Sequence, residues 1–507
     1  MATTVVKGGC AHDCPDSCAW VATVEDGRAV DLRGNPDHPF TRGGLCAKVE
    51  RYLDRVYSPD RLLHPLRRIG HKGDASFERI SWDQALAEIA ERLQAVIDAH
   101  GAEAILPYSF AGNMGLIQSR SLDRRLWAAV GASRLARTVC GGTANAGIAA
   151  VLGSTLGALP EHLRHSRTIV LWGTNTLVTN LHLWPFIREA KANGARVIAI
   201  DPLRTRTAAA ADQHLRPLPG SDVALVLGLI QVIVAEDLHD REYIERHTTG
   251  FPALSARAAA YPPRRVAELA GLAADDAVAL AREVAAAEPA AIRTGLGAEK
   301  HPQGATVFRL LASLPAITGA WRHLGGGLFP DTRGIVNDTL DVRSLNPPRQ
   351  QPLPREINMI QLGRALTDPA LEPPVKALFV YNANPAVTTP NSNLVVQGLL
   401  RDDLFTVVHE QFMTDTARHA DLVLPATGML EHLDLLYPWG HATVVLNRPA
   451  IEPPGECVSN NELFRRLARA LGRDEPGLQA SEEDLIRGVL GSGHPWMEGV
   501  TYERLWE

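Results

Sequence analysis

The chain has 507 residues, of which 45% are hydrophobic and 21% charged, and its formal net charge is -6. This length is too great for a single hydrophobic core, so we expect two to four domains. The sequence has no basic stripe of the kind that binds nucleic acid and no polybasic segment of the kind that binds an anionic membrane surface. Its longest apolar runs are too short to span a bilayer. The first residues lack the features of a signal peptide, which predicts a cytoplasmic protein in which structural disulfides are rare.

Four cysteines near the N-terminus form the first notable pattern. Cys10, Cys14 and Cys18 fall on one short stretch, and Cys46 follows after a long gap. Zinc usually takes two separated pairs of cysteines, whereas three ligands on one loop and a distant fourth suit the iron corners of a cubane. The spacing therefore predicts a 4Fe–4S cluster, with zinc or unligated thiols as alternatives. Lys48 is either a solvated lysine or a cation between this cluster and a second redox group.

An isolated cysteine, Cys140, lies where a strand-like run meets a Gly-rich turn and a helix of small residues. An isolated thiol is usually a small buried hydrophobe. A thiolate at a helix N-terminus instead has a lowered pKa and can bind a metal or act as a nucleophile. The remaining cysteine, Cys457, lacks such a context and is interpreted as structural.

A repeat with one constant offset runs through the body of the chain. The matching segments are TIVLWGTN (168–175), ARVIAIDP (195–202) and TRTAAAAD (205–212), against ALFVYNAN (377–384), LFTVVHEQ (404–411) and TDTARHAD (414–421). Each copy reads as a strand ending in Asn, a helix, and a strand ending in an acidic residue, which is where open parallel sheets bind ligands. The repeat predicts two α/β units that hold two nucleotide-like ligands, or one ligand with two arms. Alternatively, doubly wound sheets repeat by architecture alone, because Asn and Asp are also common turn formers.

Several other polar residues allow both a functional and a structural interpretation. His182 and His301 are candidates for a substrate funnel, although a lone His is more often a hydrogen-bonded structural group. Glu431, His432 and Asp434 resemble a metal-ligand set. On the helix expected there they would not share one face, so a solvated or capping role is predicted.

Taken together, these motifs resemble the molybdopterin oxidoreductases of the dimethyl sulfoxide reductase superfamily, which hold molybdenum or tungsten between two molybdopterin guanine dinucleotides. The resemblance covers essentially the whole chain. It rests on CAHDCPDSC…GGLCAK, FERISWDQAL, SFAGNMG, WGTN, IDPLRTRTA, LPGSDVAL, TGLGAEKHPQG, LPAITGAW, YNANP and TDTARHADLVLPAT.

The resemblance implies roles for individual residues. The four N-terminal cysteines would hold a 4Fe–4S cluster, Lys48 would lie between cluster and pterin, and Cys140 would supply the protein ligand to the metal. The dinucleotides of a bis-molybdopterin guanine dinucleotide cofactor would be lined by Asn113, Trp172, Gly173, Asn175, Asp201, Pro202, Thr205, Gly220, Asp222, Gly295, Gly297, Asn382, Asn384, Glu410, Thr416 and Asp421.

The implied fold is α/β, with an N-terminal iron–sulfur domain and two doubly wound domains related by the repeat. We expect a cluster domain at 1–57, a discontinuous α/β domain at 58–135 with 326–475, a dinucleotide-binding domain at 136–325, and a connector at 476–507. Family members usually carry a further C-terminal domain, about one ordinary domain in size. The chain ends near where that cap should begin, so a fragment, a separate cap polypeptide or a loss is expected.

The implied reaction is a two-electron oxidation, reduction or oxo transfer of a small substrate at molybdenum or tungsten. Electrons would pass through the cluster to a ferredoxin- or flavoprotein-like partner or to an additional subunit. Gly141 stands where formate dehydrogenases of this kind have His, which argues against formate. The alternatives are a non-catalytic relay or assembly subunit that lacks the metal, and a non-redox hydratase or transhydroxylase on the same cofactor.

Overall fold

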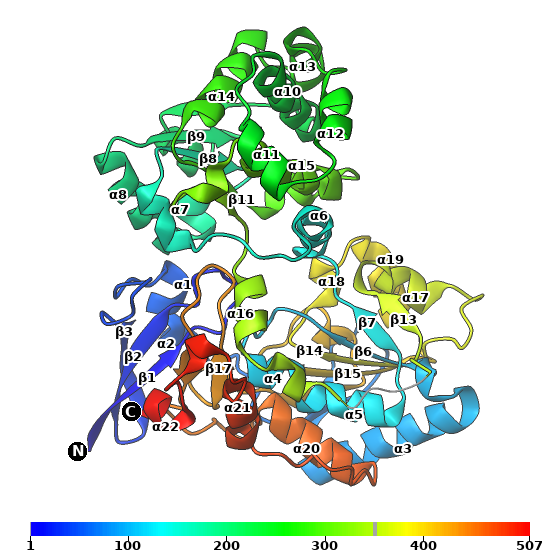
Figure 1. Cartoon of the computed structure of the whole chain (residues 1–507). Helices are drawn as coiled ribbons and strands as arrows, with labels where there is room; N and C mark the ends of the chain where they lie inside the picture. The colour runs from blue at the N-terminus through cyan, green and yellow to red at the C-terminus, as the bar shows by residue number, and fades with distance from the viewer. Residues whose placement is uncertain (1, 348–351) are drawn as a thin grey trace.

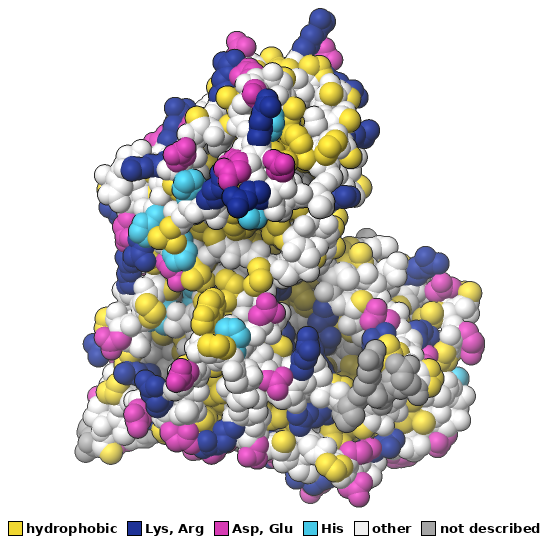
Figure 2. Space-filling model, in the orientation of Figure 1, with side chains coloured by type: hydrophobic (Ala, Val, Ile, Leu, Met, Phe, Trp, Pro, Cys, Tyr) yellow, Lys and Arg dark blue, Asp and Glu magenta, His cyan; other side chains and the backbone are white. Residues whose placement is uncertain are grey.

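The computed structural model describes residues 2–347 and 352–507, which form two lobes (Figure 1). The upper lobe in Figure 1 is built mainly from the middle of the chain, and the lower lobe combines both ends. A hollow separates the lobes on the face shown in Figure 2, and Lys and Arg side chains gather inside it. Within the described part of the chain, no helix is both long and apolar enough to cross a bilayer.

A small antiparallel sheet forms the N-terminal end of the lower lobe. It consists of β1 (Thr3–Gly9), β2 (Ala19–Glu25) and β3 (Arg28–Gly34). Asp26 and Gly27 connect β2 to β3 with φ values of 47° and 80°, the left-handed conformation that a two-residue hairpin turn requires. The loop with the first three cysteines connects β1 to β2. A hydrogen bond from Cys10 N to Cys18 O (2.9 Å) closes this loop.

The upper lobe contains a five-stranded parallel sheet with the order β10-β9-β8-β11-β12. Its strands are β8 (Thr168–Trp172), β9 (Arg196–Ile200), β10 (Gln213–Leu215), β11 (Ala290–Thr294) and β12 (Gly327–Phe329). Every residue of β8 and β11 is buried, because helices cover both faces of a parallel sheet. The chain runs outward from β8 to β10 and then returns to β11, which creates a crevice between β8 and β11.

Helices pack on the two faces of this sheet through two apolar clusters. The helices are α6 (Gly142–Leu152), α8 (Trp184–Ala192), α10 (Asp222–Ala235), α14 (Ala274–Ala286) and α15 (Gly304–Ile317). One cluster contains α8, and the other contains the remaining helices. In α10, Leu225 and Ile230 are fully buried against strand residues such as Ile198 and Ile292. β12 begins beyond the expected domain boundary at 325, because its pairing with β11 places it in this sheet.

The lower lobe contains a six-stranded sheet with the order β5-β4-β16-β15-β14-β6. Four strands are parallel: β6 (Ile105–Ser109), β14 (Ala377–Tyr381), β15 (Phe405–Glu410) and β16 (Leu422–Pro425). The short strands β4 (Leu66–Arg68) and β5 (Phe77–Arg79) add an antiparallel edge. Residues from 66 to 109 therefore share one sheet with residues from 377 to 425.

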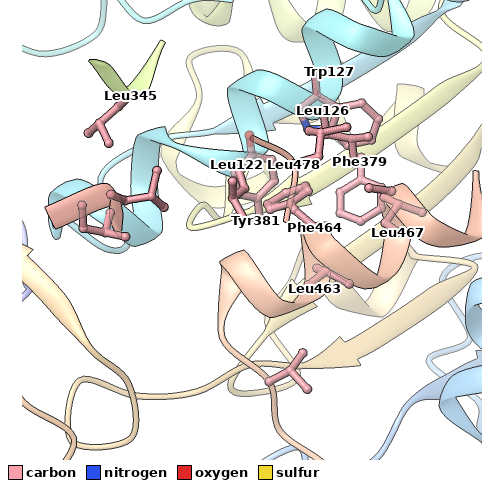
Figure 3. Close-up of a cluster of buried hydrophobic side chains, with 14 of the residues drawn as sticks. Leu122, Leu126, Trp127, Leu345, Phe379, Tyr381, Leu463, Phe464, Leu467 and Leu478 are labelled. Carbon is pink, nitrogen blue, oxygen red and sulfur yellow. The ribbon is translucent and has the colours of Figure 1, made fainter. Parts of the chain in front are cut away.

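Alternate side chains of β14 bury against opposite helical layers, as the two-residue period of a strand requires. Phe379 and Tyr381 face α5 (Leu122–Val130) and α20 (Asn460–Ala470), where they meet Leu126 and Phe464 (Figure 3). α3 (Trp82–His100) belongs to the same layer. The other face of the strand packs against α17 (Leu362–Thr367) and α19 (Ser392–Leu399).

The repeat is present in three dimensions, including its hydrogen bonds. β8, β9 and β10 correspond to β14, β15 and β16. The hydroxyl of Thr207 donates to Asn175 Oδ1 (2.9 Å), and that of Thr416 donates to Asn384 Oδ1 (2.6 Å). The carboxylate that ends each motif accepts from the neighbouring strand, at Val197 N (2.8 Å) in one copy and Thr406 N (2.7 Å) in the other. The predicted duplication of one α/β unit is thus confirmed.

The C-terminal residues are packed and do not form the expected loose connector. α21 (Glu482–Leu490) buries Leu485, Ile486 and Val489 in the same apolar cluster as α5, because its apolar residues recur on one helical face. The last helix, α22 (Tyr502–Trp506), contacts β18 (Val445–Asn447), which in turn contacts β1.

Candidate functional site

The four N-terminal cysteines lie near one another at the base of the hairpin sheet. Cys10 and Cys18 are 3% exposed, and Cys46 directly precedes α1 (Ala47–Glu50). Burial, with smaller contributions from neighbouring thiols, raises the pKa of Cys10 and of Cys14 to about 12. Among the described residues, no three His, Cys, Asp or Glu side chains are spaced to hold a single metal ion.

Asp16, inside the cysteine loop, ties this loop to the upper lobe. Its buried carboxylate accepts from Asn180 Nδ2 (2.5 Å) and lies 2.9 Å from His182 Nδ1. The same His182 nitrogen is 3.6 Å from Cys18 Sγ. The sequence allowed two interpretations of His182, a funnel residue or a hydrogen-bonded structural group, and Asp16 was missed. An acidic residue between cysteine ligands was a signal for a fixed second partner.

Lys48 lies on α1, with its side chain exposed. Its charge lowers the pKa of Cys10, in opposition to the larger effect of burial. Burial lowers the pKa of His12 to about 4, and the charges of Arg55 and Lys48 add to this. Lys48 is therefore close to the cysteine loop, and its place between the cluster and a second redox group stays a prediction.

An upper cavity of about 280 Å³ opens at the crevice between β8 and β11. Loop residues that follow four strands of the sheet, β8, β9, β11 and β12, help to line it. The predicted residues among them are Cys140, Gly173, Asn175, Asp201, Gly295 and Gly297. A Cβ at Gly295 would stand 2.5 Å from Gly173 O, so only glycine permits the two loops to approach this closely.

Cys140 lies between β7 (Arg134–Ala136) and α6, two residues before the helix begins. The expected lowered pKa of its thiol is wrong. Burial raises the pKa of Cys140, and the charge of Asp13 raises it further, while Arg333 opposes both. A helix N-terminus is too weak to offset this burial, so the thiolate form needs a cation such as a bound metal.

A lower cavity of about 480 Å³ opens at the equivalent crevice of the other sheet, between β14 and β6. The predicted residues that line it are Asn113, Asn382, Asn384 and Glu410. Burial raises the pKa of Glu410. Asn382 Nδ2 and His432 Nε2 are buried at this cavity without a hydrogen-bond partner in the described structure.

Comparison with known proteins decides the family. The model of the molybdopterin oxidoreductases matches residues 61–470, and that of the molybdopterin oxidoreductase Fe4S4 domain matches residues 3–58. The chain belongs to the molybdopterin oxidoreductase family. It is a molybdopterin-dependent enzyme whose N-terminal domain is of the 4Fe–4S type.

Individual relatives agree with this assignment. A probable oxidoreductase, YoaE, of Bacillus subtilis (strain 168) is 39% identical over 502 residues, which are 99% of this chain and 74% of that protein. The F420-dependent formate dehydrogenase subunit alpha of Methanocaldococcus jannaschii is 30% identical, over 100% of this chain and 76% of its own. Acetylene hydratase from Pelobacter acetylenicus shares the fold, with a TM-score of 0.83, 24% identity, and 98% and 73% coverage.

The residues of this molybdopterin oxidoreductase fit the groups that its family holds. The thiols of Cys10, Cys14 and Cys18, whose pKa values burial raises, suit a ligand set whose negative charge iron balances. The orphaned donors Asn382 Nδ2 and His432 Nε2 suit a ligand rich in hydrogen-bond acceptors, because buried polar groups without partners are rare.

Other predicted dinucleotide residues of the oxidoreductase lie outside the linings of both cavities. Trp172 is buried and donates through Nε1 to Asp222 Oδ1 (2.7 Å). Thr205 caps α9 (Arg206–Ala210), Pro202 precedes this cap, and Gly220 sits in an open turn with a φ of 83°.

Two further predicted residues, Thr416 and Asp421, belong to the second copy of the repeat and have structural partners. Thr416 holds the side chain of Asn384. The carboxylate of Asp421 pairs with Lys72 (3.1 Å) and Arg68 (2.7 Å). The recurring Thr and Asp thus hold strands and loops in place.

The solvated role expected for Glu431, His432 and Asp434 is wrong, because these residues lie in a buried loop and in the strand β17 (Asp434–Leu436). The alternative capping role holds for Asp434, which accepts from Ile117 N (2.8 Å) in the first turn of α4 (Leu116–Arg120). Glu431 forms an ion pair with Arg61 (2.9 Å) in which neither side chain is more than 2% exposed. Cys457 lies beside this pair, and its thiol donates to Leu62 O (3.2 Å), in keeping with a structural role.

Proposed function

We propose that this chain forms the body of a bis-molybdopterin guanine dinucleotide enzyme of molybdenum or tungsten. It would catalyse a two-electron oxidation, reduction or oxo transfer of a small substrate. One observation carries the proposal: both cavities meet at the same two segments. In the cysteine loop, Asp13 lines the lower cavity and Pro15 the upper cavity. In the segment before α6, Val139 lines the lower cavity and Cys140 the upper cavity.

Each cavity would accept one dinucleotide. Asn175 and Asp201 end two neighbouring strands at the upper cavity, and Asn384 and Glu410 do so at the lower cavity. Acidic side chains at strand ends accept hydrogen bonds from ribose hydroxyls or base amines, which suits the guanosine ends of such a cofactor. Asn175 corresponds to Asn384, and Asp201 to Glu410, at the constant offset of the repeat. We therefore assign one arm of the cofactor to each cavity.

Cys140 would hold the metal, which when bound supplies two-electron redox chemistry. The neighbouring Arg333 favours the thiolate through its charge and is held by Asp331 (2.5 Å). A Cβ at Gly141 would stand 2.7 Å from Arg333 Nη2. A side chain at position 141 would therefore displace Arg333. The glycine at this position leaves the room that Arg333 occupies beside Cys140.

Electrons would pass between the metal and the cluster held by Cys10, Cys14, Cys18 and Cys46. Lys48 would lie on this path, and its positive charge would favour the reduced cluster. Exposure of α1 beside the cluster supports an electron-transfer partner at this surface, either a ferredoxin- or flavoprotein-like protein or a further subunit.

Metal analysis of the anaerobically purified protein tests the proposal. We expect about four iron atoms and about one molybdenum or tungsten atom per chain, together with dye-linked electron transfer. Cys140→Ser should lower the activity by at least an order of magnitude while the iron content stays complete. Iron without molybdenum or tungsten would overturn the proposal in favour of a relay subunit. Turnover without net electron flow would instead indicate a hydratase.

A further inference from the structure

Cys140 lies where the chain crosses from the lower lobe to the upper lobe. Before it, the hydroxyl of Thr138 donates to Asn358 Oδ1 (2.6 Å), and Val139 packs against an apolar cluster of the lower lobe. After it, Figure 1 shows α6 at the junction of the two lobes, and Ile148 of this helix is buried in the apolar cluster of the upper lobe. The direction of the Cys140 side chain therefore depends on what holds the crossing on both sides.

The helix that follows Cys140 is capped by a residue from another segment. Its own N-cap residue, Gly141, has no side chain that could accept from the first backbone N–H groups of α6. The carboxylate of Glu299 accepts instead, with its Oε2 at 2.7 Å from Ala144 N, the third amide of the helix. An N-cap side chain ordinarily makes this bond, and here a residue 155 positions away supplies it.

Glu299 is buried, and the groups around it compensate its charge. Its side chain is 0% exposed, and its second oxygen, Oε1, lies 3.7 Å from Lys300 Nζ. Burial raises the pKa of Glu299, while the Ala144 N–H and the charges of Lys300 and Arg333 act in the opposite direction. The N-terminus of a helix also favours a negative charge. A buried carboxylate is costly without such partners, so the start of α6 and Lys300 are what keep Glu299 at this place.

The next residue, Lys300, holds the chain on the other side of Cys140. Its ammonium group donates to Val139 O, the carbonyl oxygen of the peptide that joins Val139 to Cys140. Two consecutive side chains of the upper lobe thus contact the backbone directly before Cys140 and one helical turn after it. Val139 also belongs to the packing of the lower lobe, so the contact of Lys300 joins the two lobes at this point.

The segment that carries Glu299 and Lys300 is itself fixed to the wall of the upper cavity. Gly297 N donates to Gly173 O (3.2 Å), in the loop that follows β8. A Cβ at Gly304 would stand 2.3 Å from Glu299 O, so the start of α15 packs directly on the backbone of this residue. Glu299 and Lys300 therefore act from a rigid support.

We propose that Glu299 and Lys300 are positioning residues for Cys140, which together fix the direction in which its thiolate meets the metal. This inference rests on the proposed function, which assigns the metal to Cys140. Lys300 fixes the peptide before the cysteine, and Glu299 fixes the helix after it. Groups that orient a metal ligand without touching the metal typically contribute about 10–100-fold to metal affinity or activity.

Variants of Glu299 separate this positioning from general stability. Glu299→Leu removes the acceptor at Ala144 N, whereas Glu299→Gln keeps an oxygen in its place. Asp240→Leu is the matched control, because Asp240 accepts from Tyr243 N (2.8 Å), the third amide of α11 (Arg241–His247). None of the residues of α11 lines the upper or the lower cavity. Glu299→Leu and Asp240→Leu should both melt at a lower temperature, because each loses a helix cap.

Two measurements on the full, cofactor-loaded chain report on Cys140. Hydrogen exchange of peptides that contain Ala144 should be about tenfold faster in Glu299→Leu. The electron paramagnetic resonance signal of molybdenum(V) or tungsten(V) should change its g values, because the cysteine sulfur meets the metal in a different direction. Glu299→Gln should restore both readouts, and Asp240→Leu should change neither. Lys300→Met, which removes the donor to Val139 O, should change the g values as well.

Unaltered g values in Glu299→Leu would overturn the proposal even if the protein melts lower, because Glu299 would then be only a helix cap. If Glu299→Leu does not fold, Lys300→Met carries the test, and unaltered g values in that variant would overturn the proposal. Metal content is measured on the same samples. A chain that lacks molybdenum and tungsten overturns the proposed function, and hydrogen exchange then decides alone: an unchanged rate at Ala144 in Glu299→Leu would show that Glu299 does not hold this segment.

Discussion

At the scale of single residues, His182 is an upper-lobe side chain that reaches both Asp16 and Cys18 of the cysteine loop. Its Nδ1 lies 2.9 Å from Asp16 Oδ2 and 3.6 Å from Cys18 Sγ. A Cβ at Gly44 would stand 2.5 Å from its Nε2, so a second segment of the cluster domain also closes on the ring. Hydrogen bonds to cysteine sulfurs are one of the factors that set cluster potentials. His182 is therefore a positioning residue for the cluster.

We expect His182→Leu to lower the reduction potential of the cluster by some tens of millivolts, because the thiolate of Cys18 loses a nearby donor. A redox titration followed by electron paramagnetic resonance measures this shift. His182→Gln, which keeps a donor, should restore part of it, and His247→Leu on an exposed helix should cause none. An unchanged potential in a His182→Leu protein with full iron content would contradict this role.

At the scale of elements, each copy of the repeat uses one threonine hydroxyl to join two loops. Thr416 Oγ1 donates to Asn384 Oδ1 (2.6 Å) and accepts from Ala386 N (3.0 Å). Thr207 makes the corresponding bonds in the first copy, to Asn175 Oδ1 and from Leu177 N. The hydroxyl thereby orients the Asn side chain that lines the cavity, which explains why these positions share one offset.

Thr416→Val keeps the shape of the side chain but removes both hydrogen bonds. We expect a loss of about 1–3 kcal/mol in the free energy of unfolding, because two buried polar groups lose a partner. The melting temperature should fall, and less cofactor should be retained after gel filtration. Thr416→Ser keeps the hydroxyl and should lie close to the unaltered protein. A Thr416→Val protein that melts at the unaltered temperature would show that the hydroxyl is dispensable.

At the scale of the whole molecule, the sequence predicted features that depend on short spacings or on a constant offset. The cysteine loop and the paired strands of both sheets are of this kind. The contact of Asp16 with His182 joins residues 166 apart and depends on how the lobes dock, so no local pattern predicts it. The structural role of Asp421 could not be predicted either, because a carboxylate at this position can bind a ligand or accept a hydrogen bond from a neighbouring strand.

Burial, which only the folded chain reveals, also sets the pH response of the whole molecule. It lowers the pKa of His409 and of His432 to about 4. An unfolded His takes up a proton near pH 6.5, whereas His409 and His432 stay neutral in the folded chain until the pH nears 4. Stability present above pH 6.5 is therefore lost as the pH falls toward 4, by about 1.4 kcal/mol per pH unit for each His.

The buried carboxyl of Asp434 acts in the opposite direction over nearly the same range. Burial raises its pKa to about 7, so the folded chain holds a proton that the unfolded chain releases above pH 4. Its contribution to stability is present below about pH 4 and is lost as the pH rises toward 7. It therefore offsets about one such histidine, and because burial also lowers the pKa of His12 and of His38 to about 4, the net response is a loss of stability toward acid pH. Removing a buried histidine and removing Asp434 should change the pH profile in opposite senses.

Melting temperatures measured between pH 4 and 6.5 on cofactor-loaded protein test this balance. His409→Gln should make the fall in melting temperature toward low pH shallower, because one unfavourable protonation is gone. Asp434→Asn should make it steeper, because the compensating proton is gone. His247→Gln, at an exposed site, should leave the profile unchanged. If His409→Gln and Asp434→Asn shift the profile in the same sense, burial of these side chains does not control the acid response.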